Sequence, residues 1–215
     1  MKIMLIGGHG RIALLAAPLL VQAGHEVGAA IRDPAHSADV EATGARPVLQ
    51  DVQDLDPAGW DALLRGAEAV VWSAGAGGGN PARTRAIDQE AAIASMDAAQ
   101  RIGVRRYLMV SYFGASREHG VPQDDPFFAY AEAKAAADAH LRGTGLDWTI
   151  LAPSALTVEE PSGRIDLGAA AAGSISRGNV ARMIVETLAR PALAGRFLAA
   201  NDGEQEIGAA LDAVS

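Results

Sequence analysis

A glycine-rich run near the start of the chain has the residue types and spacing to bind a phosphate. Gly7-Gly8-His9-Gly10-Arg11-Ile12-Ala13 lies between the short apolar segment Lys2–Ile6 and a helical stretch. Glycine at 7 permits a tight turn out of a strand, glycine at 10 lets the backbone approach a pyrophosphate, and Ala13 allows close packing of helix on strand. The start of the helix offers free N–H groups and partial positive charge to an anion. The run therefore predicts a phosphate-binding turn with contacts from Gly7, His9, Gly10, Arg11 and Ile12.

Tyr130 and Lys134 have a spacing that could serve proton transfer. They lie four residues apart at the start of a predicted helix, so both side chains are expected on one helical face. A lysine ammonium beside a phenol favours the phenolate and lowers the phenol pKa from about 10. A tyrosine tuned in this way can pass a proton to or from a carbonyl oxygen while hydride moves to the carbon. Tyrosine and lysine at this spacing also occur on ordinary solvated helix faces.

The end of the second predicted strand, Val27–Ile31, indicates which dinucleotide the turn would receive. Arg32 follows it directly and is placed to meet a 2′-phosphate with a planar, permanently charged side chain. NADPH is therefore favoured over NADH. Asp33 could instead receive ribose hydroxyls, so NAD stays an alternative. Further cofactor contacts are expected after the third and fourth strands, at Asp51, Val52, Ser73, Ala74 and Gly75.

Apolar periodicity predicts strands and helices in alternation. The expected strands are Lys2–Ile6, Val27–Ile31, Arg46–Leu49, Ala69–Ser73, Tyr107–Ser111, Trp148–Leu151 and Arg196–Ala200. The expected helices are Arg11–Ala23, Pro57–Arg65, Thr84–Ile102, Phe128–Arg142 and Val180–Leu188. Such alternation predicts an α/β fold, a Rossmann-type doubly wound parallel sheet with helices on both faces. Residues 1–215 are expected to form one domain, with 152–175 as a small C-terminal substrate lobe and glycine-rich loops at 75–79 and 169–173.

Composition excludes several classes of function. There is no cysteine among the 215 residues, which rules out disulfides, thiolate metal sites and cysteine nucleophiles. The net charge of −8 disfavours nucleic-acid binding. None of the five histidines has a partner at metal-ligand spacing, so no metal is expected. Without a signal-like or membrane-spanning run, a cytoplasmic protein with a small-molecule substrate is expected; oligomeric state has no signature in the sequence.

The motifs taken together resemble a known family. The chain is similar to atypical short-chain dehydrogenases/reductases, in the branch of NmrA-like and biliverdin reductase B (flavin reductase)-like NAD(P)H-binding proteins. The matching pieces follow the family's order over nearly the whole chain: Gly7–Ala13, Ile31–Pro34, Asp51-Val52, Ala98–Tyr107, Val110-Ser111, Tyr130–Lys134, Gly145–Leu151 and Ile175–Ala181.

The resemblance implies roles for individual residues. Ser111, Tyr130 and Lys134 would act together in catalysis, with Ser111 bonding the substrate oxygen and Lys134 also holding the nicotinamide ribose. Relatives commonly have Arg-Pro-Gly after the sixth strand, whereas this chain has Ala152-Pro153-Ser154. This chain therefore lacks the arginine of that motif, but Pro153 is still expected at the nicotinamide end.

The expected activity is an NAD(P)H-dependent oxidoreductase that transfers hydride between nicotinamide and a small carbonyl, quinone or flavin-like substrate. Tyr112 and Phe113 are expected to line the substrate pocket. The alternative is an NmrA-like NAD(P)-sensing regulatory protein without turnover. A sugar-nucleotide epimerase is a weaker alternative, because only about sixty residues remain after the sixth strand for a substrate domain.

Overall fold

The computed structural model describes residues 1–77 and 79–215 and contains a long, mostly parallel sheet. Within these residues the strand order is β11-β8-β10-β6-β5-β4-β1-β2-β3. The strands are β1 Lys2–Ile6, β2 Glu26–Ile31, β3 Arg46–Leu49, β4 Ala69–Trp72, β5 Arg106–Val110, β6 Asp147–Pro153, β8 Arg164–Asp166, β10 Arg196–Asp202 and β11 Gln205–Glu206. All neighbours from β3 to β10 run parallel, and β8 pairs antiparallel with both β10 and β11. A separate parallel pair joins β7 Ala155–Thr157 to β9 Ser174–Ser176.

The strand order makes this a Rossmann-like α/β fold, as expected from the sequence. The chain winds outward from β1 to β3 in one direction and then from β4 to β10 in the other. The direction of winding reverses between β1 and β4, and ligands of such sheets bind outside the carboxyl ends of the strands at this place.

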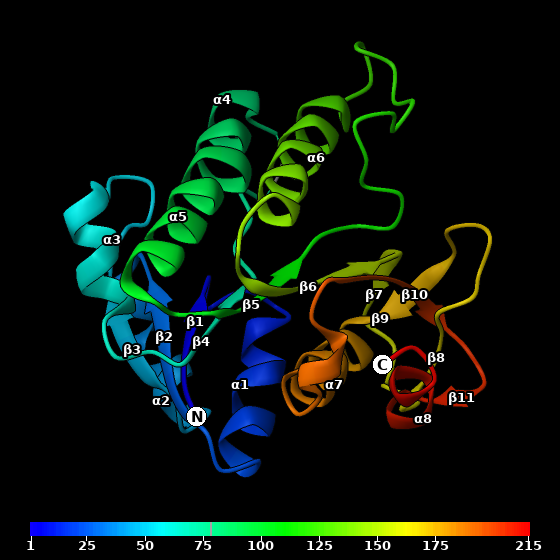
Figure 1. Cartoon of the computed structure of the whole chain (residues 1–215), viewed down its shortest axis with the longest axis horizontal. Helices are drawn as coiled ribbons and strands as arrows, with labels where there is room; N and C mark the ends of the chain where they lie inside the picture. Colours follow the sequence, from blue (N-terminus) through cyan, green and yellow to red (C-terminus); the bar gives the residue numbers. More distant parts are fainter. Residues whose placement is uncertain (78) are drawn as a thin grey trace.

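Helices cover both faces of the sheet (Figure 1). One face carries α1 Ala13–Gln22, α2 Ser37–Ala42, α7 Arg177–Leu188 and α8 Ile207–Asp212; the other carries α3 Pro57–Leu64, α5 Ala92–Ile102 and α6 Phe128–Arg142. Short 3₁₀ turns lie at η1 Pro34–His36 and η3 Pro191–Leu193. Side chains of β1 alternate between the two cores: Ile3 and Leu5 pack with α1 and α7, whereas Met4 and Ile6 pack with α3 and α5. Burial on both faces explains why β1 reads as a continuous apolar run.

The helix predicted over Thr84–Ile102 differs most from expectation. It begins at Pro81 as α4 Pro81–Thr84, because the Asn80 side chain caps it by accepting from the Arg83 N–H at 3.1 Å. It then continues as the π-helical segment η2 Arg85–Ala91 before α5. Gly103, with φ of 82°, ends it as predicted.

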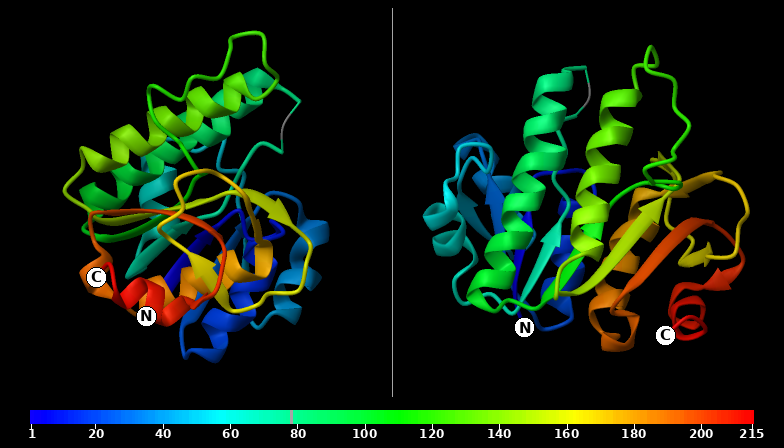
Figure 2. Two further views of the ribbon diagram at one scale, coloured as in Figure 1. Left: turned by 90° about the vertical axis from the view of Figure 1, so that its right-hand side faces the viewer. Right: turned by 45° about the horizontal axis from the view of Figure 1, so that its top comes forward.

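The remaining predicted elements lie within a few residues of their expected bounds, and α6 matches its predicted range. Sequence periodicity missed the short elements α2, β7, β8, β9, β11 and α8. Residues 169–173 form a loop, as expected; the loop predicted over 75–79 includes Gly78, which is outside the described residues. The loop joining β5 to α6 stands out beside α6 in both views of Figure 2. Across the described ranges, no helix has the length and apolar character needed to cross a membrane.

Candidate coenzyme and substrate site

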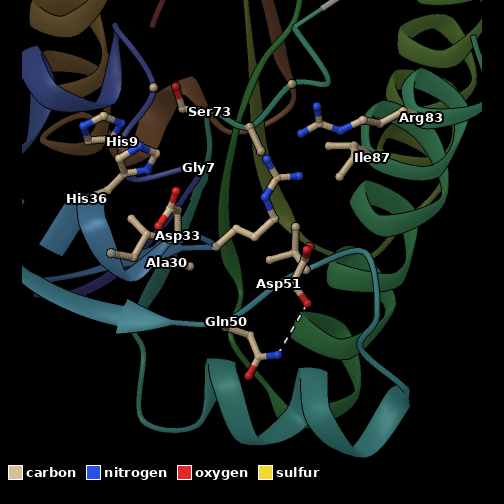
Figure 3. A pocket seen from close by; sticks show the side chains of 16 residues that line it. Gly7, His9, Ala30, Asp33, His36, Gln50, Asp51, Ser73, Arg83 and Ile87 are labelled. Atoms are coloured by element: carbon tan, nitrogen blue, oxygen red, sulfur yellow. Dashed lines mark hydrogen bonds between the residues drawn. The ribbon is translucent and has the colours of Figure 1, made fainter. Parts of the chain in front are cut away.

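A first cavity of about 240 Å³ lies at the carboxyl ends of β1, β2, β3 and β4 (Figure 3). It brings together most of the predicted cofactor contacts: Gly7, His9, Gly10, Arg32, Asp51, Val52, Ser73, Ala74 and Gly75. These residues come from four separate turns, so the fold assembles them as the sequence predicts. Pro153 lines a different cavity, described below.

Glycine is required at the turn after β1. Gly7 has φ of +83°, and a Cβ there would lie 2.5 Å from the Cα of Ala74. A Cβ on Gly10 would lie 3.1 Å from the Gly7 carbonyl oxygen. Gly8 was not singled out by sequence reasoning, yet a Cβ there would lie 2.6 Å from the Ala29 side chain. The turn is therefore pressed against β2 and the end of β4, and its backbone is exposed to the cavity.

The N-terminus of α1 supplies free donors next to this turn. The Arg11 and Ile12 N–H groups have no acceptor among the described residues, and the first turn of α1 holds no acidic side chain. Neither residue lines the cavity with its side chain, so their predicted contact would be made by the backbone. Free N–H groups at a helix start and a glycine cradle fit a pyrophosphate.

The charged residues that follow β2 and β3 differ in whether their side chains already have hydrogen-bond partners. Arg32 is exposed and lines the cavity. Asp33 accepts from the Ala35 N–H at 2.9 Å, so one of its oxygens already caps η1. Asp51 likewise accepts from the Gln53 N–H at 3.1 Å. The Arg32 side chain, by contrast, makes no hydrogen bond or ion pair with any described residue, so its whole guanidinium is open to a ligand.

His36 and Arg83 are among the cavity-lining residues that sequence reasoning missed. The His36 ring stacks on His9 with 3.6 Å between ring centroids, and His9 Nε2 lies 2.8 Å from a carboxylate oxygen of Asp39. Arg83 points from α4 toward the middle of the cavity (Figure 3). Asparagine followed by proline is typical of a helix start, so Asn80-Pro81 could have predicted a helix that begins before Thr84 and includes Arg83.

A second cavity of about 420 Å³ lies further along the same edge of the sheet, where β5 and β6 end. It is lined by the loop after β5, the start of α6, the end of β6 and β7: Ser111, Tyr112, Phe113, Phe127, Tyr130, Pro153, Ser154, Ala155, Leu156 and Ala172. Ser111 and Tyr130, predicted from sequence as catalytic, thus share one wall. Tyr112 and Phe113 line it as expected.

Lys134 lies behind this wall. Its side chain is 1% exposed, and its ammonium donates to the Val110 carbonyl at 2.8 Å and to the Met109 sulfur at 3.0 Å. It lines neither cavity, so the structure does not bring it to the place where the predicted ribose contact would be made. The Lys134 pKa is lowered by burial, against the opposing effect of Asp138 and Asp88.

Two buried carboxylates that sequence reasoning missed accompany Lys134. Asp138 lies one turn further along α6 and accepts from the Ser111 hydroxyl at 2.5 Å. Asp88, in η2, accepts from the Ala76 N–H at 3.0 Å. Burial raises the pKa of both carboxyls, and the Lys134 charge opposes that rise. The spacing of Lys134 and Asp138 on α6 was a readable signal, whereas Asp88 comes from a distant helix.

The expectation that Lys134 lowers the Tyr130 pKa is wrong. Burial is the largest cause of a raised Tyr130 pKa, and the carboxylates Asp88 and Asp138 add to it. The Tyr130 hydroxyl has no hydrogen-bond partner among the described residues. Tyr130 is therefore a neutral phenol at neutral pH, with its proton available to the second cavity.

The sequence profile of the NAD(P)H-binding family matches residues 7–191, which covers both cavities. This chain belongs to the NAD(P)H-binding family. The family match confirms the resemblance read from the motifs and the expectation of a nicotinamide dinucleotide as coenzyme. It applies to NADP and NAD alike. The glycine turn and the free N–H groups fit the pyrophosphate of such a coenzyme.

Relatives of this NAD(P)H-binding protein carry names from two classes of enzyme. The UPF0659 protein C216.03 of Schizosaccharomyces pombe is 34% identical over 85% of this chain and 82% of its own length. The Bacillus subtilis protein called uncharacterized sugar epimerase YhfK is 30% identical over 98% of this chain and 99% of its own. The crystal structure of the oxidoreductase ylbE from Lactococcus lactis is 28% identical, with a TM-score of 0.89 over 100% of this chain and 96% of that one.

Asp138 should make the stability of this NAD(P)H-binding protein depend on pH. Its raised pKa favours folding below the ordinary carboxyl value of 3.8, and this contribution is lost as pH rises through the raised value. Relative to wild type, Asp138→Asn should therefore gain stability as the pH increases over that window. Urea unfolding at a series of pH values measures the difference. Asp124→Asn, in the exposed loop before α6, is the control; a pH-independent difference for Asp138→Asn would contradict the expectation.

Proposed function

We propose that this protein is an NAD(P)H-dependent oxidoreductase that transfers hydride between nicotinamide and a small carbonyl, quinone or flavin-like compound. One observation carries the proposal. A coenzyme cavity with a glycine turn and a second cavity with a free phenol lie in succession along one edge of the sheet. Bound reduced nicotinamide would supply the hydride.

The chain's own residues would supply the proton and the orientation. Tyr130 keeps its proton because its pKa is raised. As negative charge develops on a substrate oxygen, the phenol can donate that proton, since an alkoxide is a stronger base than a phenolate. Ser111 has given its hydrogen to Asp138, so Tyr130 is the free hydroxyl donor of the pair. The Ser111–Asp138 hydrogen bond and the buried Lys134 would hold the cavity wall in place around the substrate.

NADPH is the coenzyme we propose for the reaction, on the strength of Arg32. Removing a charge-assisted contact to the 2′-phosphate by Arg32→Ala should raise the NADPH Kd by about 10- to 100-fold. NADH lacks that phosphate, so its Kd should change less than about twofold. Fluorescence titration with both coenzymes gives the ratio, and Arg65→Ala, exposed at the end of α3, is the control. An equal change for NADPH and NADH would count against the assignment.

Two rivals remain to be separated from this proposal by experiment. An NmrA-like sensor would bind NADPH tightly, but it would not oxidise NADPH whichever acceptor was added. A sugar-nucleotide epimerase would interconvert sugars without net NADPH consumption; the Bacillus subtilis relative is called an uncharacterized sugar epimerase. NADPH oxidation at 340 nm against aldehydes, ketones, quinones and flavins therefore tests the proposal. Turnover with a carbonyl or quinone supports it, and tight binding without turnover of any acceptor favours the sensor.

A further inference from the structure

We infer that the second cavity selects uncharged, conjugated carbonyl compounds and rejects substrates that carry a carboxylate, sulfonate or phosphate. The inference deepens the proposed function and rests on it. It narrows the substrate to neutral quinones and aromatic aldehydes or ketones. Sugar nucleotides and acidic pigments fall outside it.

The first observation is the charge of the cavity wall. Among the described residues that line the second cavity, there is no aspartate, glutamate, lysine, arginine or histidine. Arg177 reaches the end of β7 and donates to the Thr157 carbonyl at 2.8 Å, but it is not part of the wall. An anion taken from water into this cavity would lose its hydration without meeting a cation, which is strongly unfavourable.

The second observation is the charge behind the wall. Two buried carboxyls, Asp88 and Asp138, face one buried ammonium, Lys134. Lys134 is already engaged by a carbonyl and a sulfur. The buried groups therefore give an anionic substrate no compensating positive field, and the chain as a whole carries a net charge of −8. The coenzyme cavity is different, because Arg32 and Arg83 line it.

The third observation concerns shape and polar groups. Tyr112, Phe127 and Tyr130 form a cluster with ring centroids 5.1 to 5.7 Å apart, which offers apolar faces to a flat molecule. Both serines of the wall are already engaged: Ser111 donates to Asp138, and Ser154 donates to Asn201. The Tyr112 hydroxyl is buried within the wall and has no hydrogen-bond partner among the described residues. The free phenol of Tyr130 is left as a donor for one oxygen. A volume of about 420 Å³ suits one or two fused rings.

Matched pairs of acceptors that differ by one charge test the inference. The pairs are benzaldehyde with 4-carboxybenzaldehyde, and 1,4-naphthoquinone with its 2-sulfonate. We expect kcat/KM with NADPH to be at least about 100-fold higher for the neutral member, the equivalent of a few kcal/mol of uncompensated burial. Equal values within a pair, or a preference for the anion, would overturn the inference.

A binding measurement separates this inference from the proposed function. Titration calorimetry with benzamide and benzoate, on protein saturated with NADPH, needs no turnover. Binding of benzamide but not of benzoate supports neutral selection, even if no acceptor is reduced. A lack of reduction with every acceptor would contradict the oxidoreductase proposal, but not neutral selection. Binding of both, or of neither, overturns neutral selection.

Adding a cation to the wall provides a further test. Leu156 lines the cavity, so Leu156→Arg should raise kcat/KM for 4-carboxybenzaldehyde by at least about tenfold relative to benzaldehyde. Val158 is 82% exposed, follows β7 and is not part of the wall, so Val158→Arg adds the same charge as a control. No change in the ratio for Leu156→Arg, or an equal change in both variants, would contradict the role given to the wall.

Discussion

Gly7→Ala should weaken NADPH binding by at least about 100-fold and lower the melting temperature. The left-handed φ of +83° disfavours any side chain by about 1–2 kcal/mol, and a Cβ 2.5 Å from the Ala74 backbone adds about 1–3 kcal/mol of overpacking. The turn can relieve the overlap only by moving away from β4. That movement would displace the Arg11 and Ile12 N–H groups expected to hold the pyrophosphate.

A glycine with the same backbone conformation but open surroundings is the control. Gly24 has φ of +81°, and a Cβ there would meet no atom within 4 Å. Gly24→Ala should therefore lose only the conformational part of the stability and keep full NADPH affinity. Thermal unfolding and calorimetric titration measure both quantities. If Gly7→Ala binds NADPH like wild type and loses no more stability than Gly24→Ala, the turn is not the pyrophosphate seat.

Tyr130→Phe should lower kcat by about 100- to 10,000-fold while the NADPH Kd stays unchanged, as expected for loss of a general acid. Tyr107→Phe is the matched control. Its hydroxyl lies 2.7 Å from Ser95 in the core, so its removal should lower stability by about 1 kcal/mol and leave turnover intact. Stopped-flow measurement of a single turnover isolates the chemical step. Turnover by Tyr130→Phe at the wild-type rate would show that the tyrosine is not the acid.

The raised pKa of Tyr130 gives that prediction a second readout. A phenol is the active form in carbonyl reduction, so activity is lost as pH rises through its pKa. Because burial and the two carboxylates raise that pKa above the ordinary value of 10.0, wild-type kcat should show no loss from phenol ionisation between pH 7 and 9. A fall of kcat in that range would instead support a phenol whose pKa is lowered by Lys134.

The parts of the site that depend on local sequence were predictable. The glycine turn, Arg32 and the residues after β3 and β4 each follow a strand directly, so locating the strands located them. Ser111 and Tyr130 were also placed on one wall, because parallel strands end at one edge of the sheet and the α6 range was read correctly. The alternating apolar segments were enough to give the doubly wound sheet.

The remaining parts depend on packing between distant segments. Lys134 has the spacing of a surface pair with Tyr130, yet α6 turns it inward against β5. Asp88 reaches the same cluster from another helix, a relation that no local pattern encodes. The positions of these buried groups decide whether the Tyr130 pKa is raised or lowered. The sequence therefore predicted Tyr130 as a site residue but not its electrostatic environment.

The π-helical segment η2 sets the rotational phase of everything before it in that helix. Arg83, just before η2, and Ile87, within it, line the coenzyme cavity, and the charge of Asp88, also within η2, acts on Lys134. Shortening η2 by one residue to restore ordinary α-helical winding would rotate the preceding turn by about 100° about the axis. Arg83 would then leave the wall although no cavity residue had been replaced. Insertions and deletions at 85–91 should therefore retune coenzyme affinity more readily than substitutions on the exposed side of the same helix.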